Sequence, residues 1–282
     1  MTLFNTSAFD LNAYLARVAF DRRPARPGLS TLRDLALAHP RAIPFENLDP
    51  MLRRPVRLDI ASIQEKLVRG GRGGWCFEHN LLLGTALSAL GFTVTGLSAR
   101  VVWNVPPGVV RGRSHMVLLV PLPEGPHIID VGFGGSTPTA PLRLQPDVEQ
   151  ATAHEPFRLA TVEGGFQLDA RLEGTWKGLY IFDLQPQVLG DYEIPNWYLC
   201  NHPDSHFLAG VVAARVERDR RYALRNTEFA VHFQRGNTER RTLTSGAEIR
   251  RTLEEVFHIQ VPTERDVDEV FDRLAGPPAA AT

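Results

Sequence analysis

The sequence predicts an α+β fold in three parts, because helical and β-rich patterns occupy different stretches of the chain. Apolar residues recur at helical spacing in residues 1–91, short β-rich runs broken by proline and glycine fill residues 92–191, and residues 192–282 mix both patterns. We therefore expect a helical domain, an antiparallel sheet or barrel, and an α/β domain. At 282 residues and 43% hydrophobic, the chain is long enough for sub-domains with substantial cores.

Helix-start and helix-stop signals frame the apolar runs of the first part. Side chains that accept backbone N–H bonds favour helix starts, and glycine and proline favour helix ends. The predicted starts are Asp10, Ser30 or Thr31, and Ser62 in a capping box with Glu65, and the predicted ends are His39-Pro40 and Gly70-Gly71.

One of the two cysteines follows a glycine-rich segment. Residues 70–76 read Gly-Gly-Arg-Gly-Gly-Trp-Cys, and an apolar run from Phe77 to Leu90 follows, so Cys76 falls at the N-terminus of a buried helix. An isolated cysteine is usually a small buried hydrophobic residue. A helix N-terminus, however, favours the thiolate, and glycines let the backbone approach a ligand closely. Cys76 is thus a candidate nucleophile that needs a base and an orienting group.

A predicted β-hairpin in the second part supplies both groups. Two apolar strands flank a six-residue Pro/Gly loop at residues 121–126. If Val120 pairs with His127, His115 lies opposite Gly132, and Asp130 lies two residues away on the same face. A histidine and an aspartate on an apolar hairpin are costly to bury unless they pair. The pattern predicts a His115–Asp130 hydrogen bond, either as a stabilising pair or as part of a catalytic site.

Other β-rich and helical runs complete the prediction. Further strands are expected at residues 101–103, 166–168, 179–184 and 231–233. Two amphipathic helices are expected near the C-terminus, with apolar faces made by Ile249, Leu253 and Phe257 and by Val267, Val270, Phe271 and Leu274.

The charge and the cysteine content of the chain indicate which kinds of partner and which compartment to expect. The formal net charge is −1 and charges are interspersed, which predicts no nucleic-acid partner and no membrane-surface binding. No apolar run approaches the roughly 20 residues of a membrane-spanning helix, and the first residues lack a signal-peptide pattern. Two cysteines are too few for a disulfide framework. We expect a cytoplasmic protein with reduced thiols and a small-molecule partner.

Two further motifs indicate structure rather than binding. Cys200, His202 and His206 superficially suggest zinc, but Pro203 separates the histidines and no fourth ligand is near in the sequence. The segment Gly132-Phe-Gly-Gly-Ser136 follows a strand, but it lacks the spacing and the lysine of phosphate-binding loops. We predict no metal site, and a tight turn after the hairpin.

Four motifs occur in a characteristic order. They are Ile43-Pro-Phe-Glu-Asn-Leu48, Arg72-Gly-Gly-Trp-Cys-Phe-Glu78, Ser114-His-Met116 and Ile129-Asp-Val-Gly-Phe-Gly134. Together they resemble the arylamine N-acetyltransferases, in their bacterial form, and the similarity covers essentially the whole chain. The resemblance implies an N-terminal helical bundle, a central antiparallel β-barrel and a C-terminal α/β lid, with a Cys-His-Asp site like that of thiol proteases.

The same resemblance implies roles for single residues. Cys76 corresponds to the nucleophile, His115 to the base and Asp130 to the orienting carboxylate, while Glu46 and Arg72 correspond to a buried supporting ion pair. The positions expected to contact substrates are Phe45, Val101, Phe133 and Phe207 in the acyl and arylamine pocket and Trp103 near the coenzyme A entry.

The implied reaction is acetyl transfer from acetyl-coenzyme A to the nitrogen of arylamines, arylhydrazines or arylhydroxylamines. It proceeds by a ping-pong route through an acetyl-cysteine, with acetyl-coenzyme A as a co-substrate and no tightly bound cofactor. A cysteine hydrolase or a transglutaminase-like acyl transfer uses the same triad and stays an alternative, and a non-catalytic binding module is a third reading. The sequence is compatible with a monomer or a homo-oligomer.

Overall fold

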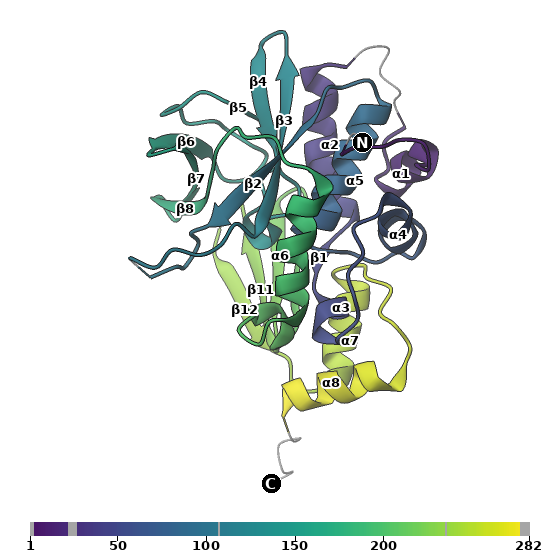
Figure 1. Ribbon diagram of the computed structural model, residues 1–282. Coiled ribbons are helices and arrows are strands. Elements are labelled where there is room, and N and C mark those ends of the chain that lie inside the picture. The colour runs from purple at the N-terminus through teal and green to yellow at the C-terminus, as the bar shows by residue number, and fades with distance from the viewer. Residues whose placement is uncertain (1–2, 22–26, 107, 235, 277–282) are drawn as a thin grey trace.

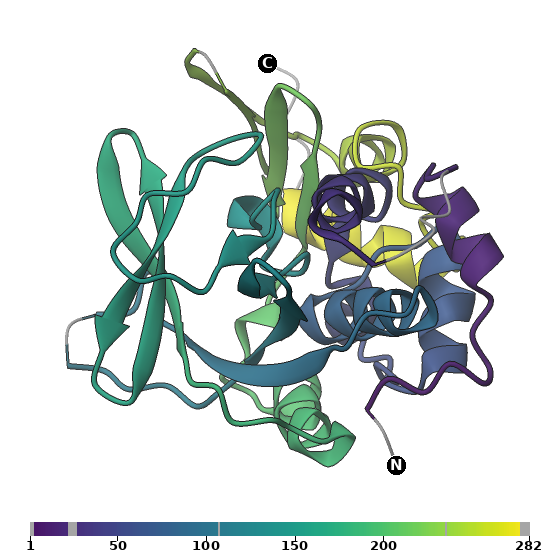
Figure 2. The same ribbon diagram turned by 90° about the horizontal axis from the view of Figure 1, so that it is seen from above.

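The first part of the chain is helical, as predicted. The computed structural model describes residues 3–21, 27–106, 108–234 and 236–276. The early elements are α1 (Leu11–Arg17), α2 (Leu29–Ala42), strand β1 (Phe45–Glu46), α3 (Leu48–Met51), α4 (Ile60–Gln64), a π-helix (Glu65–Arg69) and α5 (Cys76–Ala89). α5 is buried from Cys76 to Leu87. α1 and α4 lie on the side of α5 away from the barrel (Figures 1 and 2).

Aspartates cap two of these helices. Asp10 caps α1 as predicted, because its carboxylate accepts the Ala13 N–H at 3.0 Å. The predicted capping box at Ser62 is wrong, since the cap of α4 is Asp59, whose carboxylate accepts the Ser62 N–H at 2.9 Å. An aspartate three residues earlier satisfies the same kind of free N–H, so the helix starts sooner than the serine indicates.

Both predicted limits of α2 are also wrong. The helix follows Gly28, which forms no side-chain cap, and it continues through Pro40 to Ala42. Proline removes one helical hydrogen bond and normally ends a helix. Here His39 and Pro40 are both buried in the core, and this tertiary packing carries the helix past the proline.

The second part forms a seven-stranded antiparallel sheet that nearly closes into the predicted barrel (Figure 1). Its strands are β2 (Thr95–Val101), β3 (His115–Leu122), β4 (Gly125–Ile129), β5 (Leu142–Arg143), β6 (Phe157–Val162), β7 (Gly165–Leu172) and β8 (Thr175–Phe182), in the order β5-β4-β3-β2-β8-β7-β6. The chain after β5 returns to β6, where Asp147 N–H donates to the Leu159 carbonyl at 2.7 Å. This contact joins the two edges of the sheet.

The strand predicted at residues 101–103 ends at Val101. The N–H groups of Val102 and Trp103 both turn toward the Leu179 carbonyl, at 2.9 and 3.1 Å, instead of continuing the ladder.

The third part contains a second sheet that also takes in a strand from the first part. β1 pairs antiparallel with β9, with Phe45 opposite Ala214. The elements are α6 (Leu189–Asn201), β9 (Val212–Val216), β10 (Arg220–Arg225), β11 (Glu228–Phe233), β12 (Thr238–Thr242), α7 (Gly246–Glu255) and α8 (Arg265–Ala275), and the sheet order is β1-β9-β10-β11-β12. The predicted boundary after residue 191 falls inside α6, and the division into three domains stays a prediction.

The two C-terminal helices bury the faces that the sequence predicts. Ile249 and Leu253 on α7 and Val267 and Phe271 on α8 belong to one apolar cluster with residues of the second sheet. Figure 1 shows both helices, in yellow, at the end of the molecule opposite the β3–β4 hairpin. Within the described ranges, every helix is too short or too polar to cross a bilayer.

Candidate active site

A glycine elbow delivers Cys76 to the first position of α5. A Cβ atom on Gly73 would lie 2.1 Å from the Pro44 carbonyl oxygen, so only glycine fits there. The Gly74 N–H donates to the Pro44 carbonyl at 3.3 Å, and the Glu46 N–H donates to the Gly74 carbonyl at 2.8 Å. The elbow therefore lies flat against β1, and it presents Cys76, which is 8% exposed, at the helix N-terminus.

The β3–β4 hairpin has the predicted register. Val120 pairs with His127, and the ladder extends to Leu122 opposite Gly125, so the connecting turn is shorter than the predicted six-residue loop. Hydrogen-bonded and non-bonded pairs alternate in an antiparallel ladder, and the pair next to the closing pair is non-bonded. Pro121 and Pro126 occupy that pair, where their missing N–H groups cost nothing.

The predicted hydrogen bond between His115 and Asp130 is present. His115 Nε2 lies 2.7 Å from Asp130 Oδ2, and the two side chains are 3% and 0% exposed. Burial alone would lower the pKa of His115, but the charge and hydrogen bond of Asp130, with a further hydrogen bond to Cys76, raise that pKa to about 10. Because Nε2 is engaged by Asp130, Nδ1 is the ring nitrogen that remains for a bond to Cys76.

Asp130 itself is held by groups that favour its ionised form. Its Oδ1 accepts the Asn80 amide at 3.0 Å and the Gly132 N–H at 2.9 Å. Burial alone would raise the pKa of Asp130, but His115, Asn80 and Gly132 outweigh burial and lower it. The site therefore holds a buried carboxylate against a buried imidazolium.

Sequence reasoning did not identify Asn80. Its amide also donates to the Met116 carbonyl at 2.8 Å, so this one side chain ties α5 to β3 and to Asp130, the residue after β4. The available signal was its position, a polar residue four places after Cys76 in an apolar run.

Aromatic rings border the pair. Phe133 meets the His115 ring edge-on at 5.1 Å between centroids, and Tyr180, which sequence reasoning also missed, lies at 4.8 Å. Next to the elbow, the ring centroid of Phe207 lies 5.4 Å from that of Trp75 and 6.2 Å from that of Phe45. Three of the four expected pocket residues thus lie around the His115 ring and the elbow.

Val101 and Trp103 lie farther along the barrel. Val101 ends β2 two residues after Ala99, which pairs with His115, and Trp103 packs against the barrel's apolar cluster. Among the described residues, no hydrogen bond or ring contact joins either of them to Cys76 or His115.

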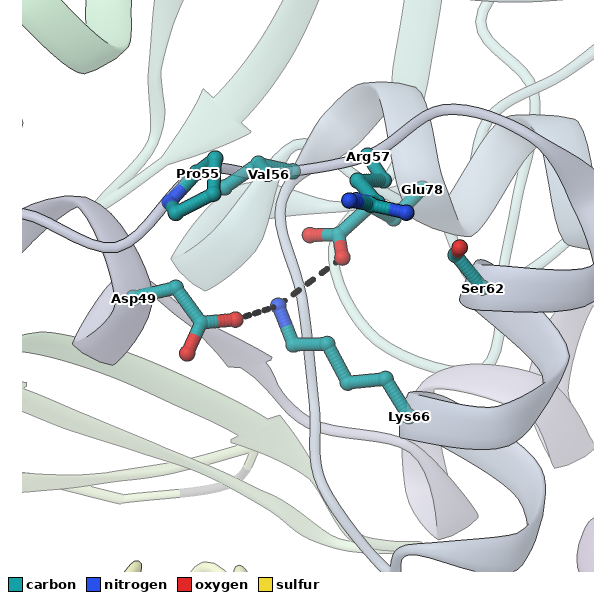
Figure 3. A pocket seen from close by; sticks show the side chains of 7 residues that line it. All are labelled: Asp49, Pro55, Val56, Arg57, Ser62, Lys66 and Glu78. Atoms are coloured by element: carbon teal, nitrogen blue, oxygen red, sulfur yellow. Dashed lines mark hydrogen bonds and ion pairs between the residues drawn. The ribbon is translucent and has the colours of Figure 1, made fainter.

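Arg72 and Glu46 form an ion pair beneath the elbow. Arg72 Nη2 lies 2.8 Å from Glu46 Oε1 and 3.1 Å from Asp49 Oδ1, and the Glu46 side chain is fully buried. Lys66 extends this network, with its Nζ 2.6 Å from Asp49 Oδ2 and 2.8 Å from Glu78 Oε1 (Figure 3). Burial would lower the pKa of Arg72 and Lys66, but these carboxylates outweigh it and raise both values.

Metal ligation is not a feature of the described residues. None of their histidine, cysteine, aspartate and glutamate side chains gather in a group of three or more that could hold an ion. Cys200 is a free, buried cysteine.

The arrangement is suited to nucleophilic acyl transfer. The positive end of a helix dipole and a neighbouring imidazolium both stabilise a thiolate over a thiol. The first N–H groups of a helix have no intrahelical acceptor, and they can stabilise an oxyanion that develops beside the sulfur.

Comparisons with known proteins agree with this geometry. A family profile described as N-acetyltransferase matches residues 28–266. The arylamine N-acetyltransferase of Mycolicibacterium smegmatis is 43% identical over 258 residues, which are 90% of this chain and 93% of that protein. The enzyme of the same name from Escherichia coli (strain K12) is 40% identical over 253 residues, 89% of each chain.

Solved structures lead to the same family. The structure of Mycobacterium marinum arylamine N-acetyltransferase in complex with CoA matches with a TM-score of 0.90 and 41% identity, and the match covers 94% of this chain and 99% of that one. A Salmonella typhimurium arylamine N-acetyltransferase matches with a TM-score of 0.86, 36% identity and coverage of 92% and 94%. This chain therefore belongs to the arylamine N-acetyltransferase family.

Proposed function

We propose that the protein transfers an acetyl group from acetyl-coenzyme A to aromatic amines through Cys76. The thiolate of Cys76 attacks the thioester carbonyl carbon, and backbone N–H groups at the start of α5 stabilise the oxyanion. The bond to the coenzyme A sulfur then breaks, and the His115 imidazolium gives its proton to the leaving sulfur. Acetyl-Cys76 and a neutral His115 remain.

The second half-reaction reverses these roles. The nitrogen of an arylamine, arylhydrazine or arylhydroxylamine attacks the acetyl carbon, and neutral His115 takes the proton that the nitrogen loses. The carbon–sulfur bond breaks, the acetylated product leaves, and the thiolate–imidazolium pair is restored. Asp130, bonded to Nε2, keeps Nδ1 directed at the sulfur throughout.

One observation carries this proposal. His115 is bonded through Nε2 to Asp130 at 2.7 Å, Cys76 contributes to the raised pKa of His115, and Cys76 is the first residue of a buried helix. Phe45, Phe133, Phe207 and Val101 are proposed to line the apolar pocket for the aromatic acceptor, and Trp103 to border the path of coenzyme A. Membership of a family whose M. marinum relative was solved with CoA supports the choice of donor.

The acyl-enzyme tests the proposal directly. Protein mixed with acetyl-coenzyme A and no amine should gain one acetyl group on the peptide that contains Cys76, and Cys76→Ser should gain none. A folded protein that stays unmodified, or a Cys76→Ser variant with full turnover, contradicts the proposed function.

A hydrolase with the same triad predicts a different product. The apolar rings around the site limit the access of water to the acyl-enzyme, which favours an amine acceptor. Adding aniline should therefore convert thioester turnover into amide formation. Turnover that releases acetate at the same rate with and without aniline supports the hydrolase instead.

We also propose a cytoplasmic location. Both cysteines are free and buried, which suits a reducing compartment.

A further inference from the structure

We propose that Lys66 is a positioning residue for Cys76 and acts through the carboxylate of Glu78. This role rests on the proposed nucleophilic function of Cys76. Lys66 has no described contact with Cys76, His115 or Asp130, and it lies in the π-helix Glu65–Arg69, which precedes the elbow. π-helical turns are rare and often occur at functional sites.

The contacts form a continuous path from Lys66 to the residue before Cys76. Lys66 Nζ lies 2.8 Å from Glu78 Oε1, and Glu78 Oε2 accepts the Trp75 N–H at 3.1 Å. A Cβ atom on Gly74 would lie 2.5 Å from Glu78 Oε2, so the carboxylate also packs directly on the elbow backbone. Glu78 thereby holds the two residues that set the position of Cys76.

Glu78 depends on Lys66 for its ionised state. Three buried carboxylates share two cations in this network, and Arg72 is engaged by Glu46 and Asp49. Among the described residues, Lys66 is the one cation that forms an ion pair with Glu78. Burial raises the pKa of Glu78, Lys66 opposes that shift, and the charges of Asp49 and Glu46 add to it. Without Lys66, Glu78 would take up a proton or turn away from Trp75 toward solvent.

The network borders a cavity of about 120 Å³ that has an opening to solvent. Asp49, Arg57, Ser62 and Glu78 line it together with Lys66 (Figure 3). Truncating Lys66 to alanine would enlarge this cavity by the volume of a three-carbon ammonium ion. A small amine can therefore reach the vacated position from solution, which makes chemical rescue possible.

The test uses Lys66→Ala in the full chain, with the rate of iodoacetamide labelling at Cys76 and the kcat of acetyl transfer as readouts. Both should fall by about tenfold or more, because a small displacement of a reacting group has an effect of this size, and the fall in kcat should exceed any change in KM. n-Propylammonium should restore both rates, and tetramethylammonium, which has the same charge and no N–H donors, should not. Arg57→Ala removes a cation from the same cavity without breaking a described ion pair, and it should behave like the parent protein.

A double variant keeps the proposal testable if Lys66→Ala is too unstable to purify. Lys66→Ala with Glu78→Gln leaves an oxygen to accept the Trp75 N–H and removes the charge of Glu78, while Asp49 keeps its ion pair with Arg72. Labelling of Cys76 should therefore return toward the parent rate. A folded double variant that labels slowly contradicts the proposal.

The outcomes separate this role from the proposed function. The proposed role of Lys66 is overturned if Lys66→Ala shows the labelling rate and kcat of the parent protein. It is also overturned if both rates are slow and n-propylammonium does not restore them. Neither result bears on the proposed function. Acetyl transfer that survives Cys76→Ser overturns the proposed function, whatever the Lys66 variants do.

Discussion

A buried histidine between a thiol and a carboxylate determines the charge of the site. The pKa of His115 is raised to about 10, so its imidazolium persists at neutral pH. This pairing contributes to the free energy of unfolding below the ordinary histidine pKa, and the contribution is lost as pH rises through about 10. A positive charge next to a sulfur stabilises a thiolate over a thiol.

The pH profile of labelling tests that charge state. Iodoacetamide should modify Cys76 much faster than Cys200, whose pKa is raised by burial. The rate at Cys76 should fall little between about pH 8 and 6, because the imidazolium persists over that range. In Asp130→Asn, the amide N–H faces Nε2 and forces the proton onto Nδ1, so labelling should become strongly pH-dependent and kcat should fall by about 10⁴-fold. If the labelling rate of Cys76 in the parent protein instead rises tenfold per pH unit around pH 7, Cys76 is an ordinary thiol and the prediction is contradicted.

The buried ion pair under the elbow makes a second residue-level prediction. Glu46→Ala removes the partner of Arg72 and the acceptor of the Leu48 N–H, which lies 2.6 Å from Glu46 Oε2. Removing one partner of a buried ion pair usually lowers the free energy of unfolding by about 3–5 kcal/mol. Because Asp49 remains next to Arg72, we expect a decrease on the order of 3 kcal/mol. Urea denaturation measures it. The matched control is Glu65→Ala in an exposed ion pair with Arg69, which should change stability little.

Between elements, the site depends on how closely the hairpin approaches α5. A Cβ atom on Gly132 would lie 2.7 Å from Cys76 Cα and 3.0 Å from the Cys76 carbonyl oxygen. Both contacts are with backbone, which has no rotamer to change. This glycine therefore lets the end of the hairpin meet the first turn of the helix.

Gly132→Ala should separate the two elements. Overpacking of this kind costs typically about 1–3 kcal/mol of stability, and the shift should lower kcat by about 10²-fold because His115 and Cys76 lie on different elements. Thermal melting and steady-state kinetics measure the two effects. Gly135→Ala is the control in the same loop, since a Cβ there meets nothing within 4 Å. Equal kinetics for both variants would contradict the close approach.

Across the whole molecule, one asparagine joins the first part of the chain to the third. The Asn47 amide donates to the carbonyls of Phe207 at 2.8 Å and Gly210 at 2.7 Å, and its oxygen accepts the Val212 N–H at 2.7 Å. These bonds hold Phe207 beside the elbow, where it contacts Trp75.

Asn47→Ala should loosen that connection. Buried groups left without partners cost about 1–3 kcal/mol each, so we expect a clear loss of stability, and KM for an arylamine should rise because Phe207 is no longer held. Asn201→Ala, which removes one exposed bond to the Trp197 carbonyl, should change neither quantity. An Asn47→Ala variant with parental KM and melting temperature would exclude this role.

Features that depend on residues close together in the sequence could be predicted, and contacts between residues far apart in the sequence could not. Local patterns in the sequence were enough to predict the order of helical and β-rich parts, the position of Cys76 at a helix start and the register that pairs Val120 with His127. These features depend on the spacing of neighbouring residues, and motif similarity led to the family.

Contacts between distant segments became visible in the folded structure alone. Pairing of β1 with β9, the bridge that Asn80 makes to the hairpin and the reach of Lys66 to Glu78 join parts of the chain that no local pattern relates. The same is true of α2, whose buried Pro40 stays helical against its own propensity. Such contacts form because the core must be filled and every buried polar group needs a partner, and these demands are met only once the whole chain has packed.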